Sequence, residues 1–340
     1  MDNAARSTRV TEVLNGRRGL FSRRAAGHAI IRAPQFAEYF ADRGFRLFAW
    51  AGAAAIILLV AAIIVQLTAK ALPAIIAYDI GFLVDTTWNV RTGEFGVLPQ
   101  IWGTLYSTAL ALLIGGFAGL TLAIFLTQGF LPTRLAQAFR TMIEMLAAIP
   151  SVVFGIWGIF VVIPAIRPVA DWLHSEMAWV PLFSTSFGGP SLLAASLVLA
   201  IMILPTCASI SQEAFELIPQ QTREAAYAMG TTRWEATLKV MVPTAAPGIF
   251  AAMVLGGGRA IGETMALAML IGHANRIDLS LFAPADTLAS LLAAHFPEAG
   301  PIEVEPLLYA ALVLLAISFL VNIAGTMMLS LTQHRICGES

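Results

Sequence analysis

Six apolar runs, each about as long as a bilayer is thick, set the main constraint on how this chain can fold. They cover residues 47–69, 101–126, 142–166, 191–210, 248–272 and 307–331. A helix needs about 20 mainly apolar residues to cross the hydrocarbon core. The runs are too long and too apolar for the strands of a membrane barrel, so helices are the form that they favour. The sequence predicts an all-α polytopic membrane protein with six transmembrane helices.

The composition agrees with this class. Hydrophobic residues make up 58% of the chain and charged residues 12%, and soluble domains carry about twice that charged fraction. The net charge of −1 gives no overall field that would favour nucleic acid. Cys207 and Cys337 are far apart and fit neither a disulfide nor a metal framework. We expect free thiols and no cofactor.

The distribution of Lys and Arg predicts the orientation. Fifteen of the 20 lie in segments 1–46, 127–141, 211–247 and 332–340, and four lie in 70–100, 166–190 and 273–306. The richer side is the cytoplasmic side, so both termini are expected in the cytoplasm. The order of charged and apolar residues at the start does not match a cleaved signal peptide.

These counts divide the chain into segments with different expected environments. The segments are an arginine-rich cytoplasmic segment at 1–46, a first helix at 47–69, an outer loop at 70–100, a core domain with five helices at 101–331, and a cytoplasmic tail at 332–340.

The inner loop at 211–247 contains signals for two short amphipathic helices. The first is expected from Pro219 to Met229, because proline suits a first turn and Gly230 suits a helix end. The second is expected to start at the capping box Thr232–Glu235 and to end at Pro243. An ordered loop of this kind indicates a docking surface for a soluble partner.

One pattern in this loop resembles the EAA loop of ABC importer permeases. It consists of Glu224-Ala225-Ala226, then Gly230 four residues later, then Pro243 at the end of the loop. The resemblance implies that the loop inserts into a groove of an ATP-hydrolysing subunit. An ordinary amphipathic hairpin at the membrane interface is the alternative. The chain has no Gly-Lys-Ser/Thr, so ATP hydrolysis is expected from a partner and no enzyme activity from this chain.

A narrower resemblance is to the phosphate-specific permeases of the PstC type. It is carried by PQIWGTLYSTALALLIG (99–115), IEMLAAIPSVVFGIWGIF (143–160), LAIMILPTCASI (199–210) and LGGGRAIGETMALAMLIG (255–272). The resemblance implies a type I ABC importer permease fold in a bacterial inner membrane and import of inorganic phosphate. It also implies a second permease of the PstA type, two ATP-binding subunits of the PstB type and a phosphate-binding protein of the PstS type.

The apolar run 248–272 carries two charges near its middle, Arg259 and Glu263. On one helix they would lie on the same face, about 6 Å apart along the axis. Each costs about 2.5–3.5 kcal/mol at the bilayer centre, so they should face protein or water. Gly258 and Gly262, like Gly115 and Gly119, have the spacing that lets helices approach closely.

Two interpretations of the charged pair stay open. One is a structural ion pair, although such pairs contribute little net stability. The other is that the planar guanidinium of Arg259 contacts the passing anion, while Glu263 holds Arg259 when no phosphate is present. Thr264 either adds a hydroxyl to this region or bonds back to its own helix. Ser151, just after Pro150, is expected where a helix breaks and donors point inward.

Other functions remain as alternatives. An intramembrane enzyme is disfavoured, because there is no His-Glu-x-x-His and no aspartate in any predicted span. A passive anion channel would explain Arg259 but not the EAA loop. A permease for another oxyanion, molybdate or sulfate, is separated from a phosphate permease only by the resemblance. In the outer loops, Trp172, Trp179, Phe183 and Phe296 either dock the binding protein or anchor the protein at the membrane interface.

Overall fold

In the computed structural model, the backbone is described for residues 36–337 and the side chains for residues 43–328. Most of the arginine-rich segment expected at 1–46, and part of the tail expected at 332–340, lie outside these ranges. The chain divides into two units, residues 1–63 and 64–340, and each is described by itself.

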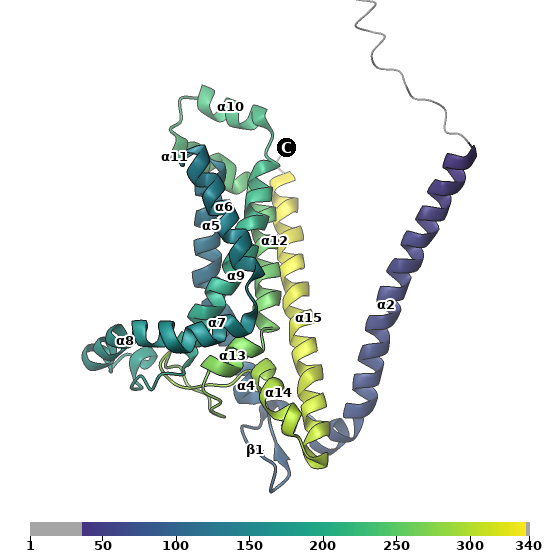
Figure 1. Cartoon of the computed structure of the whole chain (residues 1–340), viewed down its shortest axis with the longest axis vertical. Helices are drawn as coiled ribbons and strands as arrows, with labels where there is room; N and C mark the ends of the chain where they lie inside the picture. Colours follow the sequence, from purple (N-terminus) through teal and green to yellow (C-terminus); the bar gives the residue numbers. More distant parts are fainter. Residues whose placement is uncertain (1–35, 338–340) are drawn as a thin grey trace, which may run out of the picture. The chain divides into compact units, whose positions relative to one another are not determined.

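The first unit contributes the start of one long helix. Helix α2 runs from Phe36 to Tyr78 and continues into the second unit (Figure 1). It extends beyond the predicted span 47–69 at both ends. Its stretch suited to a membrane is Arg43–Tyr78. It ends before Asp79, whose φ of 47° leaves the helical region.

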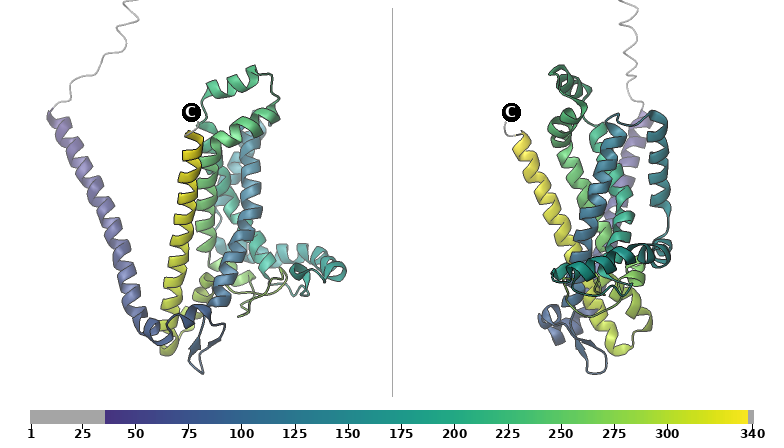
Figure 2. Two further views of the ribbon diagram at one scale, coloured as in Figure 1. Left: turned by 180° about the vertical axis from the view of Figure 1, so that it is seen from behind. Right: turned by 90° about the vertical axis from the view of Figure 1, so that its left-hand side faces the viewer.

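Four further apolar stretches of the second unit overlap predicted spans, and one of them ends at Ile261, inside the predicted span 248–272. They are Leu98–Thr127, Leu192–Glu216, Arg233–Ile261 and Pro301–Met328. The corresponding elements are α4 (Leu98–Ala111), a π-helical turn η1 (Leu112–Gly116), α5 (Phe117–Thr127), α9 (Leu192–Glu216), α12 (Val242–Ile261) and α15 (Pro301–Cys337). Helix α9 packs against α4, α5 and α12, and α12 packs against α15, so these helices run side by side (Figures 1 and 2).

The Gly115 and Gly119 pair makes the close contact that its spacing predicts. A Cβ on Gly115 would collide with the carbonyl oxygen of Ala200 on α9. A Cβ on Gly119 would lie 2.9 Å from the Cβ of Cys207 on the same helix. Glycine therefore allows the two backbones to approach more closely than any larger residue would.

The predicted span 142–166 is confirmed with shifted bounds, because the stretch that is long and apolar enough to cross a membrane is Ser151–Met177 and the chain breaks just before it. Helix α6 covers Thr133–Ala148, and a new helix starts at Ser151. The residue before a proline is pushed to extended backbone, and Ile149 has a ψ of 128° ahead of Pro150. The second helix comprises α7 (Ser151–Trp157), a π-helical turn η2 (Gly158–Val162) and α8 (Ile163–Met177). Figures 1 and 2 show it running across the bundle.

The inner loop forms the first of its two expected helices as predicted. Helix α10 covers Gln220–Ala228, and Gly230 follows it with a φ of +79°. The capping box is also confirmed, because Thr232 and Glu235 bond to each other's backbone N–H at the start of α11 (Arg233–Ala236).

The end predicted for the second helix is wrong. The helix passes through Pro243 and continues to Ile261. A π-helical turn η4 (Thr237–Met241) lies just before the proline. Such a turn changes the pairing of backbone groups, so that a proline without an N–H fits inside the helix.

The opposite end of the bundle holds the short elements. They are α3 (Gly81–Val84), the hairpin of β1 (Trp88–Asn89) and β2 (Glu94–Phe95), a 3-10 turn η3 (Pro181–Phe183), α13 (Met265–Leu270), α14 (Leu288–His295) and a 3-10 turn η5 (Phe296–Glu298). Strands β1 and β2 are antiparallel, with Trp88 opposite Phe95. Phe82, Phe95, Leu288 and Leu307 form a buried apolar cluster that joins these elements to α15.

Candidate anion pathway and coupling surface

The helix that carries Arg259 ends two residues before Glu263. Helix α12 stops at Ile261, Gly262 is its C-cap, and α13 begins at Met265. The expectation of one helix face with both charges is therefore wrong. Among the described residues, no ion pair joins Arg259 to Glu263. Glycine at a helix end and an acidic side chain before the next helix both favour a break here.

Arg259 pairs with a different element. Its Nη1 donates to the hydroxyl oxygen of Thr206 on α9 over 3.2 Å. In the part of the chain that the structure describes, this is the one hydrogen bond of the guanidinium. The side chain is otherwise exposed. Its remaining N–H groups are therefore open to a bound anion.

The contact with α9 places Arg259 near the middle of the bundle. Thr206 lies about 21 Å of helix rise after Leu192 and about 15 Å before Glu216, at 1.5 Å per residue. The sequence placed Arg259 at mid-depth by centring it on its own run. In the structure Arg259 lies near the end of α12, beside Thr206 in the interior of α9.

Glu263 supports the start of α13. Its Oε1 accepts a hydrogen bond from the backbone N–H of Ala266 over 3.4 Å. A carboxylate at this position satisfies a donor that would have no partner within the helix. Glu263 therefore contributes to the helix break rather than to the guanidinium of Arg259.

Ser151 lies at the start of a helix that packs beside α13. A Cβ on Gly155 of α7 would lie 3.4 Å from the Cα of Ala266, and one on Gly158 would meet the side chain of Leu270. These contacts place α7, which begins at Ser151, beside α13.

Thr264 faces a different environment. It lines a cavity of 340 Å³ together with Leu292, Ala293, Phe296, Leu307, Leu308 and Ala311. Its neighbours there come from α14, α15 and the turn between them, and all are apolar. The structure thus separates Thr264 from the bond between Arg259 and Thr206.

The close glycine contact on α12 also differs from the expected one. A Cβ on Gly256 would lie 2.6 Å from the Sγ of Cys207 on α9. A Cβ on Gly258 would lie 3.5 Å from the Oδ1 of Asn322, which is an ordinary contact. Gly262 meets only the backbone of its own helix. Gly258 and Gly262 are therefore not a packing pair, because the helix ends between Ile261 and Gly262.

The candidate coupling surface predicted from the sequence is built around α10. Glu224 and Ala225 are exposed, and Ala226 is buried against the apolar cluster that contains Phe215 and Met241. Glu224 accepts a hydrogen bond from Gln220 over 2.7 Å. The stretch therefore exposes Glu224 and Ala225, while the buried Ala226 anchors it.

A cavity and apolar side chains surround this stretch. The cavity measures 570 Å³ and is lined by Glu216, Ile218, Gln220, Arg223, Glu224 and Tyr227. Leu217 is 83% exposed and Met229 is 84% exposed. Arg233 donates to the carbonyl of Gly129 over 3.0 Å, which fixes the loop to the end of α5.

A buried carboxylate organises the end with the hairpin. The side chain of Asp286 is buried and accepts hydrogen bonds from Ser290 Oγ at 2.6 Å and from the backbone N–H of Thr287 at 3.0 Å. His273 Nε2 lies 2.6 Å from the carbonyl oxygen of Ala268, and its Nδ1 lies 3.4 Å from Asp286. Because both ring nitrogens face acceptors, the charged imidazolium is favoured. The hydrogen bond to Asp286 raises the pKa of His273 above its usual value.

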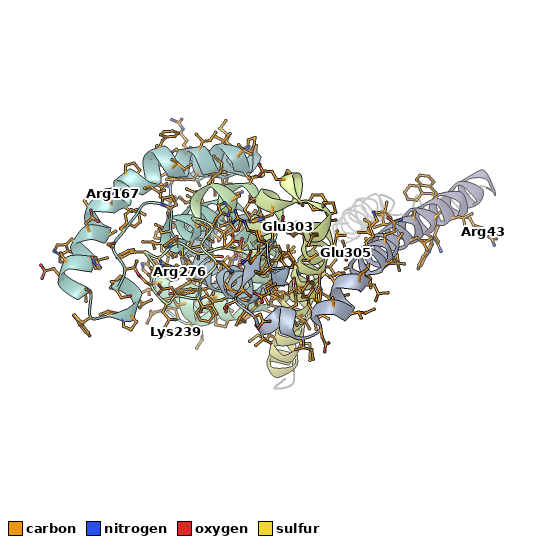
Figure 3. The ribbon with its side chains drawn as sticks, turned by 90° about the horizontal axis from the view of Figure 1, so that it is seen from below. Arg43, Arg167, Lys239, Arg276, Glu303 and Glu305 are labelled. Atoms are coloured by element: carbon orange, nitrogen blue, oxygen red, sulfur yellow. The ribbon has the colours of Figure 1, made fainter. Side chains whose placement is uncertain are left out.

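The outer aromatic residues fall into two groups. Trp172, Trp179 and Phe296 are exposed, and Trp179 is 80% exposed. Phe183 is half-buried and packs on Phe282 with ring centroids 5.5 Å apart. Figure 3 views this end and shows Arg167 on the arm formed by α8, with Glu303 and Glu305 at the start of α15.

Sequence reasoning missed Thr206 and Asp286. Thr206 stands in an apolar run, where nothing in its neighbours indicates a bond to a residue 53 positions away. Asp286 lies in a loop, where an acidic residue is normally solvated. Only the tertiary arrangement brings these two side chains to their partners.

The chain is similar to a well-defined group of transport proteins. Residues 115–330 match the family described as binding-protein-dependent transport system inner membrane component. The phosphate transport system permease protein PstC of Mesorhizobium japonicum is 37% identical over 82% of this chain and 87% of that protein. PstC of Haemophilus influenzae is 36% identical over 82% and 90%. The probable PstC of Methanocaldococcus jannaschii is 34% identical over 75% and 83%.

Solved importer structures share the fold at low sequence identity. A chain of the bacterial alginate ABC transporter in complex with an alginate pentasaccharide-bound periplasmic protein is 15% identical, with a TM-score of 0.57 over 84% of this chain and 94% of that one. A chain of the inward-facing MetNI methionine ABC transporter is 18% identical, with a TM-score of 0.52 over 69% and 95%. The fold is therefore that of a type I ABC importer permease. The chain belongs to the binding-protein-dependent transport system inner membrane components, and within them to the PstC permeases, as a multi-pass inner membrane protein.

Proposed function

We propose that this chain is the permease subunit of an ATP-driven importer of inorganic phosphate, and that the anion passes Arg259. The relatives that it matches over most of its length are named as phosphate transport permeases. The observation that carries the pathway is the guanidinium of Arg259, near mid-depth, with one hydrogen bond to Thr206 and an otherwise exposed side chain.

The chemistry of Arg259 suits this cargo. A guanidinium presents a planar fork of donors that matches the oxygens of phosphate and keeps its charge at any physiological pH. In a low-dielectric setting, one such charge offsets much of the cost of moving an anion. A single site also releases its anion more readily than a cluster of basic residues would.

The residues at the two helix breaks complete the proposed pathway. Ser151 offers a hydroxyl at the start of α7, where the first backbone N–H groups of the helix have no partner within it. Glu263 stabilises the break at residues 262–264 through Ala266. Thr264 belongs to the same break and lines the apolar cavity beside it. Broken helices of this kind form substrate sites in other transporters.

The inner loop is proposed to couple this chain to its ATP-hydrolysing partner. Glu224, Ala225 and Gly230 are exposed, Glu224 lines the 570 Å³ cavity, and the buried Ala226 anchors α10. Pro243 and the π-helical turn before it join the loop to α12, which carries Arg259. A movement of the loop would thus reach the pathway along the helix that runs from Arg233 to Ile261.

The proposed assembly contains a second permease of the PstA type, two ATP-binding subunits of the PstB type and a binding protein of the PstS type. In this assembly the partner subunits hydrolyse ATP and this chain does not. The termini are proposed to lie on the cytoplasmic side with α10. The exposed Trp172 and Trp179 are proposed to meet either the binding protein or the membrane interface.

Transport by the reconstituted assembly tests the cargo. The complex is placed in liposomes with ATP and the binding protein, and uptake of radiolabelled phosphate is measured with arsenate, sulfate or molybdate in competition. We expect ATP-dependent phosphate uptake that arsenate reduces and that the other two leave unchanged. Uptake of sulfate or molybdate in place of phosphate would assign another oxyanion, and uptake without ATP would indicate a channel.

Co-purification tests the coupling surface. Glu224→Arg reverses a charge at the centre of the exposed stretch, and Glu176→Arg makes the same change on the exposed surface of α8 as a control. We expect the first variant to lose the ATP-binding subunits and the control to retain them. Equal retention by both variants would place the docking surface elsewhere.

A further inference from the structure

The hydroxyl of Thr206 takes an unusual partner for a threonine inside a helix. Thr121, Thr127, Thr237 and Thr244 each donate to the carbonyl oxygen four residues earlier. Thr206 makes no such bond among the described residues, and its oxygen accepts from Arg259 instead. Since a guanidinium has no acceptor, the hydroxyl hydrogen of Thr206 is not used in this contact.

Close packing fixes where Thr206 and Arg259 meet. Cys207, the next residue on α9, lies against the Cα of Gly256, and its Sγ donates to the carbonyl of Ala252 over 3.7 Å. Gly256 is one helical turn before Arg259, so the two contacts lie along the same side of α12. The bond from Arg259 therefore follows from the register of two buried helix backbones. It is not merely one of many positions of a flexible side chain on an open surface.

The backbone beside Thr206 also departs from a regular helix. Pro205 lies inside α9 and has no N–H, so the carbonyl of Ile201 loses its usual donor. A proline commonly bends a helix at this point. The bend lies one residue before the threonine that holds the guanidinium.

We propose that Thr206 is a positioning residue of the anion pathway. Its oxygen holds the guanidinium of Arg259 in place, and its hydroxyl hydrogen donates to an oxygen of the anion that Arg259 binds. This proposal rests on the proposed role of Arg259. Thr206 would add a neutral hydrogen-bond donor to the site. Its hydroxyl would accept one hydrogen bond from Arg259 and donate one to the anion.

The test uses the complete complex in liposomes with ATP, the binding protein and radiolabelled inorganic phosphate. Phosphate taken up per ATP hydrolysed is measured for Thr206→Val, which removes the hydroxyl at nearly constant shape. Thr206→Ser keeps the hydroxyl, and Thr121→Val removes a hydroxyl bonded back to its own helix. Each variant is first shown to co-purify with its partners. A fourth variant carries Thr206→Val together with Arg259→Gln.

We expect Thr206→Val to lower the ratio about fivefold, the effect of one hydrogen bond. Thr206→Ser should restore it, and Thr121→Val should leave it unchanged. Thr206→Val should add nothing once Arg259 is replaced, because the two residues act together. Two results would overturn the proposal while leaving Arg259 on the pathway. One is a normal uptake of phosphate per ATP for Thr206→Val, and the other is a double variant that is more impaired than Arg259→Gln alone. A normal ratio for Arg259→Gln would instead overturn the proposed pathway itself.

Discussion

The guanidinium of Arg259 on α12 donates to the hydroxyl of Thr206 on α9 over 3.2 Å, and Glu263, four residues on, bonds to the backbone of Ala266 instead. The two charged side chains of this apolar region thus have separate tasks. Arg259 keeps donors open beside the interior of α9, and Glu263 supports the start of a new helix. Among the described residues, the break between them leaves Arg259 without a carboxylate partner that would compete with an anion.

Glu263 should therefore matter for stability more than for transport. Glu263→Ala removes the acceptor for Ala266 and should lower the free energy of unfolding by about 1 kcal/mol. Glu263→Gln keeps an acceptor at the same position and should be close to neutral. Thermal unfolding in detergent and phosphate uptake per ATP are the measurements. If Glu263→Gln abolished uptake in a stable complex, the carboxylate charge would have to act on the anion or on Arg259 directly.

The contact of α4–α5 with α9 should be sensitive to a single methyl group. Gly115→Ala places a Cβ against the carbonyl of Ala200 and should cost about 1–3 kcal/mol of stability, as overpacking does. Gly52→Ala is the matched control, because a Cβ there meets nothing within 4 Å. The stability of both variants is measured as the midpoint of thermal unfolding in detergent. Equal midpoints for the two variants would show that the helices are farther apart than described.

The outer end should respond to pH through His273. Asp286 raises the pKa of His273, so the charged form is more stable in the folded protein than in the unfolded chain. The stabilisation is fully present below about pH 6.5, the ordinary value for histidine. It is lost as pH rises through the raised folded pKa.

Unfolding temperatures measured from pH 5.5 to 8.5 check this dependence. We expect the wild-type protein to lose stability across the upper part of that range relative to His273→Gln. Asp286→Asn should remove most of the difference, although it also weakens the bond to Ser290. A parallel pH profile for wild type and His273→Gln would show that the imidazole gains no charge on folding.

The features that depend on local chemistry could be predicted from the sequence. Hydropathy over about 20 residues predicts spans such as 191–210 and 307–331, because each run must satisfy its own backbone in lipid. The cap at Thr232, the stop at Gly230 and the start at Pro219 follow from neighbours within four residues. The family pattern in the inner loop was recognisable for the same reason.

The helix breaks were harder to predict. Pro150 marks one break, but the apolar residues on both sides of it read as a single span. Gly262 follows a run of glycines with the spacing of a packing stripe, so the sequence predicts a helix that continues to Glu263 and beyond. Pro243 predicts a helix end, although a π-helical turn accommodates it. Local composition does not distinguish these outcomes, because neighbouring helices decide which backbone groups find partners.

Uptake by the Arg259→Gln variant shows whether phosphate passes Arg259. The control is Arg43→Gln, which removes an exposed arginine on α2. Both variants are assembled with their partners, and the phosphate taken up per ATP hydrolysed is measured in liposomes. We expect at least a tenfold lower ratio for Arg259→Gln, roughly the loss of a charge-assisted hydrogen bond, and a near-normal ratio for the control. A wild-type ratio for Arg259→Gln in an intact complex would contradict it.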